Sequence, residues 1–98
     1  MKVQMDVTAT SQLIENGKMP ELMETALGRI HPEAAYFGTE DGKRTAFLFF
    51  DLKEPSDLPS LAEPFFDSGK AAIQVTPVMT ADDLKAGLKK LESSRAAA

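Results

Sequence analysis

The stretch EDGKRTAFLFFDL, residues 40–52, constrains the fold more than any other part of the chain. Asp41-Gly42 is the strongest hairpin signal in the sequence, because a type I′ turn needs two residues that tolerate positive φ. The run from Thr45 to Leu52 is expected to form one strand of that hairpin, and EAAYFGT the other. Side chains of a strand alternate between the two faces of a sheet, and this run puts apolar side chains on both faces. The sheet therefore needs a cover on each side.

The hairpin register assigns residues to these two faces. With Asp41 and Gly42 as the loop, Tyr36 faces Phe47 and Phe37 faces Ala46. One face is then predicted to carry Ala35, Phe37, Ala46, Leu48 and Phe50. The opposite face, called the reverse face below, is predicted to carry Ala34, Tyr36, Thr45, Phe47 and Phe49.

Periodicity predicts the elements before the hairpin. Residues 1–8 alternate strictly between apolar and polar side chains, which is typical of a half-buried strand that shows Gln4 and Asp6 to the reverse face. TSQLIENG is expected to be a loop or a single turn. A helix then follows over residues 19–30, with Pro20 in its first turn and the His31-Pro32 pair at its end.

The elements after the hairpin are predicted in the same way. A helix capped by Ser56 and stopped at Gly69 is expected to be short or broken at Pro64, with Phe65 and Phe66 packed inward. KAAIQVTPVMT, residues 70–80, is expected to be an edge strand because proline cannot donate to a central ladder. Thr80 then begins a last helix, which carries a narrow stripe of Leu84, Leu88 and Leu91.

This order of elements predicts an α+β fold of the ferredoxin-like type. The pattern is β-α-β-β-α-β with an extra C-terminal helix, and it implies one antiparallel sheet with strand order 4-1-3-2 and helices on one face. The strand that contains Pro77 then lies at an edge of the sheet, and the strand that is apolar on both faces lies in the middle. Residues 1–98 are expected to form a single domain, with residues 93–98 as a frayed tail.

Composition excludes several classes of function. The formal net charge of −4 argues against nucleic acid or an anionic membrane as a partner, since both need clustered Lys and Arg. The chain has no cysteine, which removes disulfides and thiolate chemistry and fits a cytoplasmic protein. Its N-terminal segment has no continuous apolar stretch, so neither a signal peptide nor a membrane span is predicted.

Three segments resemble a known superfamily. PEAAYF, DGKRTAFLFFDL and PSDLPSLAEPFF, with the order of elements, are similar to an uncharacterised family of short bacterial proteins in the dimeric α/β-barrel superfamily. The resemblance implies a homodimer in which two ferredoxin-like subunits put their sheets face to face. Members of the superfamily include muconolactone isomerases, cofactor-free oxygenases and haem-degrading enzymes. The absence of Trp and the single histidine, in a loop, depart from the haem and Trp-dependent patterns.

Few residues are candidates for chemistry. His31 is a candidate general base or metal ligand because an imidazole can exchange a proton or bind a metal, and the plainer interpretation is a surface histidine at a helix end. Asp6 with Tyr36 or Asp51 is a candidate acid–base pair, because an aromatic floor disfavours the charged form of a carboxylate; the plainer interpretation is a solvated sheet face or interfacial hydrogen bonds in a dimer. No ligand set for a metal and no fingerprint for a cofactor occurs, so none is predicted.

Two functions follow from these predictions. The first is a homodimer that binds a small apolar molecule near a face carrying Gln4, Tyr36, Phe47, Phe49, Asp51 and Gln74. The alternative is a cofactor-free isomerase or oxygenase that uses Asp6, Tyr36 or His31. The dimer has a monomeric rival, in which the C-terminal helix folds back and covers the reverse face with Leu84, Leu88 and Leu91.

Overall fold

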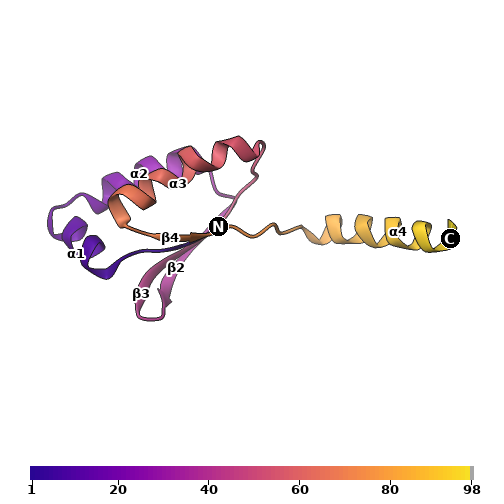
Figure 1. Cartoon of the computed structure of the whole chain (residues 1–98), viewed down its shortest axis with the longest axis horizontal. Helices are drawn as coiled ribbons and strands as arrows, with labels where there is room; N and C mark the ends of the chain where they lie inside the picture. The colour runs from indigo at the N-terminus through magenta and orange to yellow at the C-terminus, as the bar shows by residue number, and fades with distance from the viewer. Residues whose placement is uncertain (98) are drawn as a thin grey trace.

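The structure, a computed structural model, describes residues 1–97 and contains one antiparallel sheet with its helices (Figure 1). In chain order the elements are β1 (Lys2–Gln4), α1 (Val7–Glu15), α2 (Met19–Ile30), β2 (Ala34–Glu40), β3 (Lys43–Phe49), a short 3-10 helix (Pro55–Asp57), α3 (Leu58–Gly69), β4 (Ala72–Gln74) and α4 (Ala81–Ala97). The strand order is β2-β3-β1-β4, with all neighbours antiparallel. This is the predicted order, and it is compatible with a ferredoxin-like α+β fold.

The hairpin forms at the predicted turn. Asp41 and Gly42 have φ angles of 54° and 73°, the left-handed region that a type I′ turn requires. Tyr36 pairs with Phe47, and Phe37 with Ala46, as the register predicts. Strand β3 ends at Phe49, so Phe50 to Leu52 lie beyond it.

The core lies between one face of the sheet and helices α2 and α3 (Figure 1). Burial removes apolar side chains from water and is the main favourable term in folding. The buried cluster consists of Val3, Met5, Ala26, Ile30, Ala46, Leu48 and Phe65. Phe37 lies on this face as predicted, since it pairs with Ala46, but it is 58% exposed and is not part of the buried cluster.

Helix α1 corrects two predictions. TSQLIENG was expected to be a loop, and the strand was expected to continue to Thr8, but β1 ends at Gln4 and α1 begins at Val7. Asp6 causes the change, because its carboxylate accepts a hydrogen bond from the Ala9 N–H at 2.8 Å and caps the new helix.

Helix α3 continues through Pro64, contrary to the predicted break. Proline has no N–H to give the carbonyl four residues earlier, which belongs to Ser60. That carbonyl oxygen instead accepts from Arg29 Nη1 on α2 at 3.3 Å, so a neighbouring helix supplies the missing donor.

The ends and faces of α3 also differ from prediction. Ser56 lies in the 3-10 helix and does not cap α3, and Lys70, in the left-handed conformation, follows its last residue, Gly69. Phe65 is fully buried, whereas Phe66 is 45% exposed, so only one of the two phenylalanines packs inward.

Helix α4 extends away from the rest of the molecule, at the far end of its 61 Å long axis (Figure 1). Thr80 and Asp83 cap it reciprocally: the Asp83 N–H donates to Thr80 Oγ1 at 3.1 Å, and the Thr80 N–H donates to Asp83 Oδ2 at 3.2 Å. Residues 81–96 are all exposed, so α4 does not cover the reverse face. The helix runs on to Ala97 through the segment expected to fray, and Ala98 lies outside the described residues.

Candidate functional site

The reverse face of the sheet lies opposite the two core helices and presents a row of residues across all four strands. Tyr36 on β2 pairs with Phe47 on β3, Phe47 with Lys2 on β1, and Lys2 with Gln74 on β4. The next row runs through Gly38, Thr45, Gln4 and Ala72. The face is therefore aromatic toward β2 and β3 and polar toward β1 and β4.

Two aromatic rings on the reverse face are exposed to solvent. Tyr36 is 64% exposed and Phe49 is 42% exposed. Their rings meet edge to face, with centroids 6.5 Å apart and planes at 76°, a favoured aromatic geometry. Phe47 is half-buried beside them. These three side chains form the aromatic patch that the sequence predicts.

A polar group adjoins the aromatic patch on the side of the hairpin turn. Lys2 Nζ lies 2.9 Å from Glu40 Oε2, and Gln4 Nε2 donates to the Glu40 carbonyl oxygen at 3.0 Å. Glu40 Oε2 is buried and accepts no well-aligned hydrogen bond from residues 1–97, so the Lys2 ammonium acts on it as a charge partner. These contacts hold the polar side chains of the reverse face in place without any partner chain.

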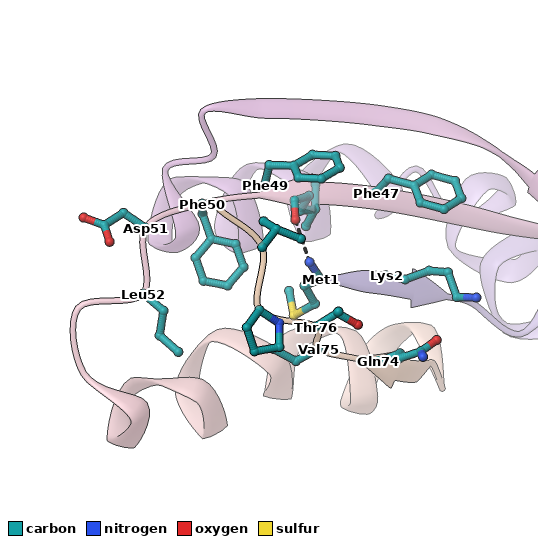
Figure 2. Close-up of a pocket in the computed structure, with 13 residues that line it drawn as sticks. Met1, Lys2, Phe47, Phe49, Phe50, Asp51, Leu52, Gln74, Val75 and Thr76 are labelled. Atoms are coloured by element: carbon teal, nitrogen blue, oxygen red, sulfur yellow. Dashed lines mark hydrogen bonds between the residues drawn. The ribbon is translucent and has the colours of Figure 1, made fainter. Parts of the chain in front are cut away.

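A groove of about 540 Å³ lies at the other end of the sheet, beside Phe49 (Figure 2). It forms because β1 begins at Lys2, whereas the segments that follow the strands on either side of β1 extend beyond it. These segments are residues 50–52 after β3 and residues 75–78 after β4. Figure 2 shows the Phe49 and Phe50 rings on one side, Val75 and Thr76 on the other, and Met1 between them. Its lining is mostly apolar, which suits an apolar ligand.

The α-ammonium of Met1 is the charged group in the floor of this groove. It donates to the Leu48 carbonyl oxygen at 2.6 Å. Burial lowers the pKa of this ammonium below its usual value, because desolvation disfavours the charged form. Asp51 also lines the groove, but its carboxylate points away from the aromatic rings (Figure 2).

The three candidate catalytic residues occupy different elements. Asp6 caps α1 and is not on the reverse face, so the strand position that would have put it beside Tyr36 is wrong. His31 is exposed and ends α2 in the left-handed conformation, at φ 50° and ψ 62°. Tyr36 projects from β2 on the aromatic patch. These positions give no support to an Asp6–Tyr36 acid–base pair.

A second groove, of about 650 Å³, contains His31. It lies at the C-terminal end of α2, and Arg29, Asp51, Lys53 and Asp57 also contribute to its lining. Asp51 Oδ2 and Lys53 Nζ are 3.9 Å apart, and both side chains are largely exposed. Charges this exposed are strongly screened by water, so the groove has the character of a solvated surface.

The sequence predicts the aromatic patch but not the groove at Met1. The patch follows from a two-residue turn that fixes the hairpin register. The groove depends on where β1 begins and on the path of residues 75–78, which no local pattern specifies. The apolar residues Val75 and Val78 on either side of Pro77 were the available signal, and they were assigned to the edge strand.

No family model, curated protein or solved structure matches the chain. Within residues 1–97, no group of three or more His, Asp or Glu side chains is placed to hold a metal ion. No helix in the same part of the chain combines the length and the apolar character that crossing a membrane demands.

Proposed function

We propose that the protein acts as a homodimer whose two copies pack their reverse faces together, and that the groove beside Phe49 binds a small, mostly apolar molecule. The observation that carries the proposal is the uncovered aromatic patch. Tyr36 and Phe49 keep 64% and 42% of their surface exposed, and α4, the one element the sequence offered as a cover, lies elsewhere.

The size of the reverse face fits a second copy of the chain. The three aromatic side chains supply roughly 200–400 Å², near the upper end of the apolar patch that a monomer carries. A stable interface buries about 800 Å² per partner, so it requires the whole four-stranded face and not only the rings. A face-to-face dimer uses the whole of that face, because each sheet covers the other.

The polar half of the reverse face is compatible with burial. Lys2 and Glu40 are already paired at 2.9 Å, so closing a second sheet over them leaves neither charge without a partner. A buried charge without a partner is strongly destabilising, whereas in a pair the mutual attraction offsets part of the desolvation cost. Gln74, in the same row as Lys2, adds an amide that can bond across a two-fold axis.

The groove is adjacent to this interface because Phe47 and Phe49 belong to both. A second sheet packed on the aromatic patch raises the wall of the groove and reduces its contact with water. Apolar ligands bind best in sites of that kind, with a few polar groups to orient them. The Met1 ammonium and the Gln74 amide are two of the polar groups that line it.

Light scattering over a dilution series of the full chain tests the dimer. The variant Tyr36→Glu/Phe49→Glu places two charges on the patch and is expected to weaken this association at least 100-fold, since buried unpaired charges are costly. Phe66→Glu is the matched control, because Phe66 is 45% exposed but lies on α3. Equal association of the double variant and the wild type contradicts the proposal.

An apolar fluorescent probe, anilinonaphthalene sulfonate, tests the groove. Val78 is 70% exposed and lines it, so Val78→Asp is expected to reduce probe binding without loss of stability. Ile14→Asp is the control, since Ile14 is 49% exposed on α1 and lies outside the groove. Undiminished binding by Val78→Asp excludes the groove as the site.

A further inference from the structure

Helix α4 has an apolar stripe that no other residue in the described part of the chain, residues 1–97, covers. Leu84, Leu88 and Leu91 are 50%, 50% and 48% exposed, close to the 49% of Ile14 on α1. The segment that joins α4 to β4 is exposed too, with Val78 and Met79 at 70% and 65%. Most of the stability of a helix in a protein comes from packing of its amphipathic face, and residues 81–96 of this 17-residue helix are all exposed.

The spacing of the stripe identifies the kind of partner it fits. Steps of three and four residues lead from Ala81 through Leu84, Leu88 and Leu91 to Arg95, which is the a/d repeat of a coiled coil. A helix that packs on a sheet or a globular core needs a broader apolar face. The remaining positions of α4 are charged or small, so its narrow seam fits one other helix.

Charges beside the seam select a second copy of α4 in the antiparallel direction. Lys85 and Glu92 flank the seam at equivalent positions of successive heptads, and in an antiparallel pair such positions face each other. When Leu88 of one copy packs against Leu91 of the other, Lys85 faces Glu92 in both directions. Gly87 and Ser94, both small, then meet on the opposite flank. This register therefore forms two equal ion pairs and no clash.

The other arrangements lack this complementarity. An antiparallel pair shifted by one heptad places Lys85 against Lys85. A parallel pair sets Lys85 and Glu92 against Thr80 and Gly87, which form no ion pair, and brings Arg95 against Arg95. In the selected register Arg95 lies beside Leu84, where its aliphatic stem can cover the leucine.

We propose that α4 is a self-association helix that forms an antiparallel two-stranded coiled coil with α4 of a second copy. This interface is separate from the reverse face, because α4 points away from the sheet (Figure 1). Two different two-fold interfaces on one chain produce a closed tetramer or an open chain of copies. Either interface alone produces a dimer.

Native mass spectrometry and light scattering on the full chain separate the two interfaces. In the Tyr36→Glu/Phe49→Glu background the chain is expected to remain a dimer held by α4, and adding Leu88→Glu is expected to leave monomers. Ala86→Glu, on the exposed polar side of α4, is the control and keeps the dimer. If Leu88→Glu leaves the mass in this background unchanged, α4 packs on another surface or on nothing, and the proposal is overturned. If only the reverse-face interface is absent, the Tyr36→Glu/Phe49→Glu variant has the same assembly mass as the wild type.

Charge reversal tests the orientation. In the same background, Lys85→Glu alone and Glu92→Lys alone are each expected to weaken association about tenfold, because every cross-pair becomes repulsive. The double reversal Lys85→Glu/Glu92→Lys restores the opposite charges and is expected to recover the affinity of the parent. A parallel pair predicts no change for either single reversal. Absence of weakening, or absence of rescue, overturns the antiparallel register.

Discussion

Arg44 joins strand β3 to helix α1 by a hydrogen bond to Thr10. Its Nη1 donates to Thr10 Oγ1 at 2.8 Å and lies 3.3 Å from Ser11 Oγ. Thr10 is fully buried, and its hydroxyl in turn donates to the Asp6 carbonyl oxygen at 2.8 Å. The contact fixes the helix that the sequence pattern missed to the central part of the sheet.

Replacing Thr10 by valine is expected to lower the free energy of unfolding by about 1–3 kcal/mol. Valine keeps the shape of threonine but removes the hydroxyl that accepts from the Arg44 guanidinium. A hydrogen-bonding group that is buried without a partner is costly. Urea denaturation measures the change. Thr8→Val is the control because Thr8 is exposed on the same helix, and an equal loss there would show that the Arg44 contact is not the cause.

Gly42 and Gly28 are a matched pair of substitution sites that tests the hairpin turn. Neither has an atom within 4 Å of the place where a Cβ would stand, so space does not distinguish them. Gly42 has a φ of 73°, whereas Gly28 lies within α2. Gly42→Ala is expected to destabilise the protein by about 1 kcal/mol, since alanine disfavours the left-handed region.

The same substitution at Gly28 is expected to stabilise by roughly 0.5–1 kcal/mol, because alanine is the better helix former. Thermal denaturation of both variants gives the comparison. A stabilising Gly42→Ala would contradict the type I′ turn, and with it the hairpin register that places Tyr36 and Phe47 on one face.

The parts of the fold that the sequence predicts are those with strong local signals. Asp41-Gly42 fixes the hairpin and its faces, and the periodic apolar residues of α2 identify that helix. Thr80 stands at the predicted start of α4, where it forms a reciprocal cap with Asp83. In each case one short segment specifies the conformation, so distant contacts are not needed.

The missed parts depend on contacts between distant segments. Helix α1 buries Thr10 and not a row of leucines, because Arg44 supplies a polar partner for it, so apolar periodicity is weak there. The Ser60 carbonyl tolerates Pro64 because Arg29 donates to it. In the candidate site, the hairpin register predicts the aromatic patch. The predicted strand position of Asp6 is wrong, because Asp6 caps α1 and β1 ends before it.

Phe65 and Phe66 are neighbours on α3 with opposite environments, which makes them a test of the core. Phe65 is fully buried, at 0% exposure, while Phe66 is 45% exposed. Phe65→Ala is expected to cost about 3–5 kcal/mol, because a buried aromatic leaves a cavity. Phe66→Ala is expected to cost under about 1 kcal/mol. Chemical denaturation distinguishes them, and similar losses would mean that α3 is rotated about its axis.

Asp6 separates a structural role from a catalytic one. Its carboxylate accepts from the Ala9 N–H at 2.8 Å, so Asp6→Ala is expected to lower the free energy of unfolding by about 1 kcal/mol. Asp6→Asn is expected to keep nearly all of the stability, since asparagine caps helices as well as aspartate does. Urea denaturation of the two variants measures the difference. Equal stability of the alanine and asparagine variants would show that the cap does not hold α1, and would reopen the question of what else the carboxylate does.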